Sequence, residues 1–343
     1  MSTTTTATPV DLETIGDVVT PYALRIAATV RIADRIAAGV TGLTELAAAT
    51  GVRERVLGSL LRYLACREVF TETAPGEFGL TPAAEQLRED HPQSLRFDFD
   101  LTEVRSRVET AHLSFLAFAG AGGPGSAYAA HYGRDFWSDL ARDPALAASW
   151  DRFMSRVTRA AAPDVVGLHD WSTHRHVVDV GGGSGTLLAS VLRAGEHLTG
   201  TVLDLAPAVA AARTELAAAG LSDRADAVEA DFFEPLPDTG DAYLLCQVLH
   251  DWDDDAAVRI LRRCVDAAGP GGHVLVVERM AGAHTDPRAA TWMDLRMLLL
   301  FGSGERAAAE YRALMERAGL QVADGAGDGQ EMALLDGRVP DRA

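Results

Sequence analysis

Residues 176–279 alternate short apolar segments with amphipathic ones, and this alternation constrains the fold more than any other feature of the sequence. Five segments have the length and apolar content of strands: 176–180, 200–205, 226–231, 242–249 and 273–279. Helical patterns, such as those at 186–195 and 256–269, lie between them. Parallel strands need crossover helices, and those helices cover both faces of the sheet. The sequence therefore predicts a doubly wound α/β domain.

A polar residue, in most cases an acid, closes each predicted strand. In an open parallel sheet the ligand binds beyond the carboxyl ends of the strands. An acid after a strand is most often a solvated turn residue, but five at one edge predict a binding site. These residues are Asp179, Asp204, Asp231, the pair His250 and Asp251, and Glu278.

The segment 179–185, DVGGGSG, joins the first strand to the next helix. Its glycines let the backbone approach a ligand closely at a helix N-terminus, where free N–H groups favour a carboxylate or phosphate. Asp204 follows about 20 residues later, where a ribose-binding acid is expected. The chain lacks the G-x-G-x-x-G pattern and the second half of a dinucleotide-binding fold, whereas Asp231 and Phe232 suit an adenine ring. S-adenosylmethionine (SAM) fits this pattern.

His250 lies in the stretch QVLHDWDDD, where an apolar run ends in a histidine and a cluster of acids. An isolated histidine most often caps a helix or is buried in a core, but its position at the ligand edge favours a general base. Asp251 is expected to orient the turn or contact the substrate. The acids at 253–255 are expected to complement the dipole of the helix that follows.

The N-terminal part of the chain carries a different pattern. Residues 43–70 predict two short helices joined by a Gly-containing turn, and 71–82 predict a small hairpin, as in a winged helix. A wide apolar helical pattern from about residue 20 to 37 predicts burial against a second subunit. We expect a packing or dimerisation module, because Glu54 and Glu68 offset the arginines of the second helix.

Charge and cysteine content exclude several classes of protein. With 31 Lys and Arg against 49 Asp and Glu, the net charge of −18 argues against a nucleic-acid or membrane partner. Cys66, Cys246 and Cys264 lie far apart, so neither a disulfide framework nor a metal site is expected. The N-terminus has no secretory pattern, and no apolar run is long enough to span a bilayer. We expect a cytoplasmic enzyme without a metal.

Seven ordered motifs resemble those of the SAM-dependent small-molecule O-methyltransferases of the caffeate and bacterial polyketide type. They are VVDVGGGSGTLL, TVLDL, DFFEPLP, VLHDWDDDAAVRILRRC, GPGGHVLVVE, MDLRMLLLFGSGERAAAEY and AGL. The resemblance implies a Rossmann-like SAM-binding domain, an N-terminal winged-helix dimerisation domain and a homodimer. We expect the dimerisation domain at 1–95, a helical linker and substrate-pocket region at 96–165, and the SAM domain at 166–343.

The same resemblance implies roles for individual residues. The expected SAM-binding residues are Asp179, Gly181, Gly183, Gly185, Asp204, Leu205, Asp231, Phe232 and Cys246. His250 is the expected base, with Glu278 and Glu305 holding its imidazole. The expected acceptor-binding residues are Trp137, Met154, Asp251, Met293, Asp294 and Met297. Two departures from the family pattern are Cys246, where Lys or Ser is common, and Arg67 with Glu68 before the wing.

The expected chemistry is methyl transfer to a phenolic hydroxyl of a small aromatic, polyketide-type acceptor. A phenol near pKa 10 and a histidine near 6.5 differ by roughly 3.5 units. Carboxylates that stabilise the imidazolium would close this gap, as would proton loss concerted with methyl transfer.

Three questions stay open from the sequence. The segments LSDRADAVEADFFEPLP and DLRMLLLFGSGER resemble a branch of anthracycline-tailoring proteins that bind SAM but hydroxylate or decarboxylate their substrate. A regulatory protein that uses the winged helix to bind DNA is a second alternative, which the negative charge disfavours. The Gly-rich loop at 119–125 is either a linker or an active-site lid.

Overall fold

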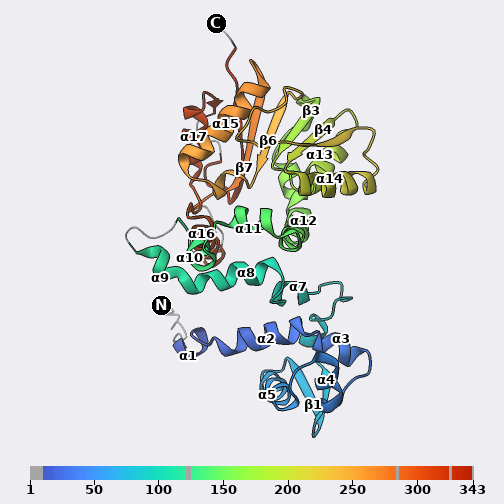
Figure 1. The fold of residues 1–343 in the computed structure, drawn as a ribbon. Coiled ribbons are helices and arrows are strands. Elements are labelled where there is room, and N and C mark those ends of the chain that lie inside the picture. The colour runs from blue at the N-terminus through green and yellow to red at the C-terminus, as the bar shows by residue number, and fades with distance from the viewer. Residues whose placement is uncertain (1–10, 121–124, 283–285, 324–326, 342–343) are drawn as a thin grey trace, which may run out of the picture. The chain divides into compact units, whose positions relative to one another are not determined.

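The computed structural model describes residues 11–120, 125–282, 286–323 and 327–341 (Figure 1). The chain divides into two compact units, one reaching to Arg107 and the other beginning at Val108. Residues 121–124, which form most of the Gly-rich loop predicted as either a linker or an active-site lid, lie outside the described residues. Within the described residues, no helix combines the length and the apolar character that crossing a lipid bilayer requires.

The second unit is built on a seven-stranded sheet in the order β5-β4-β3-β6-β7-β9-β8. The strands are β3 (His176–Val180), β4 (Thr199–Asp204), β5 (Ala225–Glu229), β6 (Ala242–Cys246), β7 (His273–Arg279), β8 (Gln321–Val322) and β9 (Met332–Arg338). The first five in this order are parallel, while β9 runs antiparallel to β7 and β8 antiparallel to β9. The predicted doubly wound fold is confirmed, and the two last strands are an addition.

Helices cover both faces of this sheet (Figure 1). The chain places α13 (Thr186–Ala194) and α14 (Ala206–Ala218) against one face, and α15 (Asp254–Ala268) and α17 (Ala308–Arg317) against the other. Successive residues of β3 point to opposite faces, so Val177 packs with α13 and α14 while Val178 packs with α15 and α17. Both are fully buried, which explains why the strand sequences are almost continuously apolar.

Most of the other helices of the second unit precede the sheet, whereas η3 (Leu249–Asp251) follows β6 and α16 (Pro287–Phe301) follows β7. Those that precede the sheet are η1 (His112–Ser114), α9 (Phe115–Ala119), α10 (Ala127–Tyr132), α11 (Phe136–Arg142), α12 (Pro144–Gly167) and η2 (Trp171–Thr173). Asp143 begins α12 by accepting the N–H groups of Ala145 and Leu146, with Pro144 as first helical residue. This long helix runs past residue 165, where the sequence placed a domain boundary, so that division stays a prediction.

The first unit contains the predicted pair of helices and hairpin. Its elements are α1 (Leu12–Ile15), α2 (Val19–Thr29), α3 (Ile32–Ala37), α4 (Leu43–Thr50), α5 (Glu54–Ala65), β1 (Phe70–Ala74), β2 (Glu77–Leu80), α6 (Pro82–Glu85) and α7 (Arg96–Phe99), and α8 (Val104–Ala111) begins before the boundary at Arg107. Leu57, Leu61 and Leu64 form the buried stripe of α5. The single helix expected at 20–37 is wrong in one respect. Arg31 adopts a left-handed conformation with φ of 60° and separates α2 from α3.

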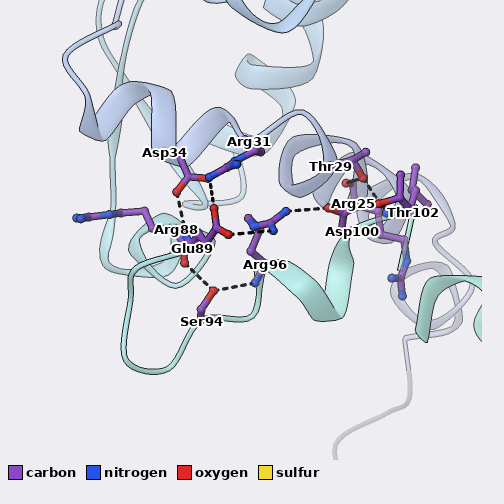
Figure 2. Close-up of polar contacts among 11 residues, drawn as sticks. Arg25, Thr29, Arg31, Asp34, Arg88, Glu89, Ser94, Arg96, Asp100 and Thr102 are labelled. Atoms are coloured by element: carbon purple, nitrogen blue, oxygen red, sulfur yellow. Dashed lines mark hydrogen bonds and ion pairs between the residues drawn. The ribbon is translucent and has the colours of Figure 1, made fainter. Parts of the chain in front are cut away.

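A chain of ion pairs ties α3 to α7 within the first unit (Figure 2). Arg31 contacts Glu89, and Glu89 Oε1 lies 3.8 Å from Arg96 Nη2. Arg96 in turn donates to Asp100 Oδ2 at 2.8 Å, and both of these side chains are less than a tenth exposed. Because removal of one partner leaves the other charge buried, such a pair fixes its segment firmly.

Apolar side chains on α1 and at the start of α2 are exposed in the single chain. Leu12, Ile15, Val18 and Val19 each expose more than half of their surface, whereas Ala27 and Ala28 of the same stretch are buried. Several large apolar side chains this close together on a surface are typical of a protein–protein contact.

Candidate active site

The loop after β3 brings two aspartates and the glycine segment together. Gly183 has a φ of 56° and donates its N–H to Asp204 Oδ2 at 2.8 Å, so the acid that closes β4 also holds the loop that follows β3. A Cβ on Gly182 would lie 2.5 Å from the carboxylate of Asp179, so any larger residue there would require that carboxylate to move. The carboxylates of Asp179 and Asp204 therefore lie directly against this loop, which leads into the N-terminus of α13.

Three carboxylates at this loop have pKa values above their usual range. Burial, and then the neighbouring Asp204, raises the pKa of Asp179 to about 7. Burial and Asp204 also raise the pKa of Asp151, on α12, to about 6, and burial raises that of Asp204 itself. The Asp179 Oδ2 atom has no hydrogen-bond partner among the described residues. Acids that disfavour one another's charge in this way fit a cationic ligand, and SAM carries both an ammonium and a sulfonium.

Two other residues predicted to bind SAM, Phe232 and Cys246, lie near the same loop. A Cβ on Gly181 would lie 3.1 Å from Val248 and 3.6 Å from the Phe232 ring, so that ring lies against the loop. Asp231 is exposed and accepts the N–H of Phe233 at 2.9 Å. Burial, together with Asp179 and Glu278, raises the pKa of the Cys246 thiol, which keeps it protonated beside the loop. Leu205 is exposed just before α14, and Gly185 is left-handed at the N-cap of α13.

The fourth strand ends earlier than the sequence predicted. The apolar run 242–249 suggested a strand up to His250, but β6 ends at Cys246 because Gln247 takes a left-handed conformation with φ of 53°. The chain then turns through η3, which contains His250. His250 is 7% exposed, so the histidine is buried at the edge of the sheet rather than aligned with a strand.

Three carboxylates surround the imidazole of His250. Glu305 Oε1 lies 3.4 Å and Glu278 Oε2 3.8 Å from Nδ1, while Asp251 Oδ1 lies 3.4 Å from Nε2. Burial by itself lowers the pKa of His250. The carboxylates of Glu278, Asp251 and Glu305 together outweigh burial and raise this pKa from 6.5 to about 10. Burial also raises the pKa of Asp251 and of Glu278 to about 7. His250 in this cluster therefore binds its proton more tightly than a free histidine in water does.

Glu278 has a second contact that the sequence did not predict. Its Oε1 atom accepts the N–H of Val248 at 3.1 Å and that of Leu249 at 2.8 Å. Glu278 is fully buried, so these two hydrogen bonds fix the start of the turn that carries His250. Its distance to the imidazole is longer than a hydrogen bond, and its effect on His250 there is electrostatic.

The residues expected to contact the acceptor lie on α11, α12 and α16, apart from Asp251 in the His250 turn. Met293, Asp294 and Met297 lie on α16, and the exposed Asp294 accepts the N–H of Glu305 at 2.9 Å, which links this helix to the base cluster. Trp137, on α11, stacks on Phe301 with ring centroids 5.7 Å apart. Met154 is half-buried on α12.

Two family models match this chain: an O-methyltransferase domain over residues 116–321 and an O-methyltransferase dimerisation domain over residues 12–90. The first alone covers more than half of the sequence. The chain belongs to the O-methyltransferase family.

Relatives match this O-methyltransferase over most of its length. A 2,7-dihydroxy-5-methyl-1-naphthoate 7-O-methyltransferase from Streptomyces carzinostaticus is 45% identical over 92% of this chain and 94% of the relative. An aclacinomycin 10-hydroxylase from Streptomyces purpurascens is 40% identical over 91% of this chain and 84% of the relative. A crystal structure of an O-methyltransferase from neocarzinostatin biosynthesis, in complex with SAM and 2-hydroxy-5-methyl naphthoic acid, matches with a TM-score of 0.85 and 43% identity, over 97% of this chain and 100% of that chain.

These matches confirm the prediction of a SAM-dependent O-methyltransferase with a dimerisation domain. Within the described residues, no group of three or more His, Cys, Asp or Glu side chains is arranged to hold a metal ion.

Three contact residues of this O-methyltransferase site were missed in the sequence. Asp151 lies on α12 close enough to Asp204 to have its pKa raised. Ser155, one helical turn later, donates to Ser184 of the glycine segment at 2.7 Å. Arg306 donates to the turn that carries His250. Helical spacing alone could have paired Asp151 with Ser155, but only the fold places them at the glycine loop.

Proposed function

We propose that this protein transfers the methyl group of SAM to a phenolic hydroxyl of a small aromatic acceptor, with His250 as general base. The observation that carries the proposal is the buried imidazole within 4 Å of three carboxylates, at the same sheet edge as the glycine loop. A base at this edge can meet an acceptor hydroxyl that points toward the cofactor.

The raised pKa of His250 suits a phenol as proton donor. A free histidine, with a pKa near 6.5, takes a proton from a phenol of pKa near 10 only at a cost of about 5 kcal/mol. The carboxylate cluster brings His250 to about 10, so the transfer is close to balanced. His250 accepts the proton at Nε2, next to Asp251, while Glu305 and Glu278 hold the Nδ1 side.

The glycine loop and its acids are the proposed binding site of the cofactor. SAM supplies an electrophilic methyl group and a good leaving group when bound. The N-terminus of α13 suits its carboxylate, and Asp179 and Asp151 suit its cationic groups. Asp204 is proposed to bind the ribose, and Asp231 and Phe232 to flank the adenine.

An aromatic acceptor is supported by a cluster of rings on α11, α12 and α16. Phe136, Trp137, Trp150 and Phe301 pack against one another with centroid distances from 4.9 to 6.0 Å. The indole N–H of Trp137 is buried and has no hydrogen-bond partner among the described residues. Because a similar curated protein is named for a naphthoate and a similar solved structure contains a naphthoic acid, a hydroxynaphthoic acid is the first acceptor to test.

The proposed assembly is a homodimer formed through the N-terminal unit, whose exposed apolar residues on α1 and α2 support it. The charge of −18 supports a small-molecule role in the cytoplasm over binding to nucleic acid or to a membrane surface.

Mass spectrometry of the products tests the proposed function. The purified protein is incubated with SAM and a panel of hydroxynaphthoic acids and larger phenolic polyketides, with and without a reductant. We expect a product heavier by one CH2 group and an equal amount of S-adenosylhomocysteine. The alternative is hydroxylation or decarboxylation of the acceptor, and one relative is named as a hydroxylase. A product that gains oxygen or loses carbon dioxide while SAM stays intact would show that alternative in place of methyl transfer.

A further inference from the structure

The segment that follows α16 contacts the His250 turn through its backbone as well as through Glu305. Ser303 donates its hydroxyl to the carbonyl oxygen of His250. Three residues later, Arg306 Nη1 donates to the carbonyl oxygen of Leu249 at 3.0 Å, and Nη2 to that of Trp252 at 2.6 Å. The carbonyl groups within and after η3 are thus held by side chains more than 50 residues away in the sequence.

The guanidinium of Arg306 suits this task because of its shape. Arg306 is 8% exposed, and its Nε atom donates to Asp254 Oδ1 at 3.0 Å, at the start of α15. Three separate N–H groups therefore reach three acceptors around one turn. A lysine at this position would carry the same charge but could not match three acceptors in a fixed plane.

Glu278 holds the other side of the turn. Its carboxylate accepts the N–H groups of Val248 and Leu249, so both the donors at the start of the turn and the acceptors that follow have buried charged partners. This arrangement also stabilises the left-handed Gln247, a conformation that costs free energy in a residue other than glycine. The backbone on both sides of His250 is thereby fixed.

We propose that Arg306 is a positioning residue for His250, holding the turn at Leu249 and Trp252 so that the imidazole stays between its carboxylates. The inference rests on the proposed role of His250 as the base. Among the described residues, Arg306 donates hydrogen bonds to Leu249, Trp252 and Asp254, and none of these goes to the imidazole or to the glycine loop. Its effect on the reaction is transmitted through the backbone of the turn.

The pH profile separates this role from a direct charge effect. The charged groups that face His250 are Glu278 on β7, Asp251 on η3 and Glu305 before α17. Removal of a nearby cation by itself raises the pKa of a histidine, whereas an imidazole that leaves its carboxylates has a lower pKa. The two effects of an Arg306 substitution on the pKa of His250 thus have opposite signs.

The test compares Arg306→Met and Arg306→Lys with the wild-type protein, using S-adenosylhomocysteine formation from pH 6 to 10.5. For Arg306→Met we expect kcat to fall on the order of 100-fold, as for a misplaced catalytic group, with SAM affinity unchanged in calorimetry. Activity should rise with pH as His250 loses its proton, and this rise should begin at a lower pH in Arg306→Met than in the wild type. Arg306→Lys should recover part of kcat and of the pH profile.

Arg317→Met is the matched control, because Arg317 is half-exposed and donates to Asp255, the neighbour of Asp254, without contacting the turn. It should keep both kcat and the pH profile. Ser303→Ala is a milder variant that should shift the profile in the same direction if Arg306→Met does not fold. A lower melting temperature for the Arg306 variants with an unmoved or alkaline-shifted profile would overturn the positioning role.

Failure of the proposed function gives a different result. If the wild-type protein forms no S-adenosylhomocysteine with any phenolic acceptor, methyl transfer itself is wrong. If the wild-type protein methylates and the Arg306 variants keep its kcat and profile, only the positioning role is wrong.

Discussion

Glu305→Gln should move the pH dependence of catalysis toward lower pH. The substitution keeps the shape of the side chain and removes the negative charge 3.4 Å from His250 Nδ1. Because the carboxylates favour the imidazolium, loss of one of them lowers the pKa of His250. The neutral base then becomes available at lower pH, so the ascending limb of kcat/KM should begin earlier.

The size of this change follows from the cluster. Three carboxylates raise the pKa of His250 from 6.5 to about 10 and also overcome the effect of burial. Two charges 3.4 Å apart at an effective dielectric constant near 20 interact by about 5 kcal/mol, which sets an upper bound of roughly 3.6 pH units. Division of the rise from 6.5 to about 10 among three partners gives a smaller value, so we expect a displacement of about 1 to 2 pH units.

The assay measures kcat/KM for a hydroxynaphthoic acid from pH 6 to 10.5, with the formation of S-adenosylhomocysteine as the readout. Glu316→Gln is the control, since Glu316 is exposed on α17, and its profile should match the wild type. A limb that stays in place in Glu305→Gln would show that it belongs to the phenol of the acceptor. The proposed coupling between Glu305 and His250 would then be wrong.

Two further predictions concern the cofactor and the stability of the fold. Asp204→Ala should weaken SAM binding roughly 10- to 100-fold, because it removes a charged acceptor of the Gly183 N–H as well as the proposed ribose ligand, while the exposed Asp226→Ala should leave calorimetric affinity unchanged. His169→Gln should reduce the loss of stability on acidification. Burial lowers the pKa of His169 and of its partner His174, so the unfolded chain binds more protons as the pH falls below about 6.5. Denaturation at pH 5 and pH 7.5 measures this, and an equal loss in wild type and variant would contradict it.

The sheet and the location of the site could be predicted from the sequence because both follow from local patterns. Alternating strands and helices imply a parallel sheet, and its geometry places the residues that close the strands at one edge. Asp179 and Asp204 meet there for that reason, and the turn after β6 carries His250. The final strands β8 and β9 were not predicted, since the first is two residues long and β9 pairs antiparallel with β7.

The details around the base depend on contacts between distant segments and could not be read locally. The sequence 242–249 favours a strand, yet Gln247 leaves it because Glu278, 31 residues later, accepts the N–H groups of the turn. In the same way, FGSGER contains a Glu with an expected role, but nothing in its spacing shows that Arg306 reaches Leu249 and Trp252. Tertiary hydrogen bonds override strand propensity at both places.

The most direct test of methyl transfer with His250 as base is a single-turnover experiment with SAM labelled with carbon-13 in its methyl group. Wild type and His250→Ala are mixed with a hydroxynaphthoic acid, and the label is followed by mass spectrometry while calorimetry gives SAM affinity. We expect the wild-type protein to move the label onto the acceptor oxygen. His250→Ala should bind SAM with the same affinity and lose most of the transfer rate. Transfer at the wild-type rate in His250→Ala would show that His250 is not the base, and label that stays on SAM in the wild type would show that methyl transfer does not take place.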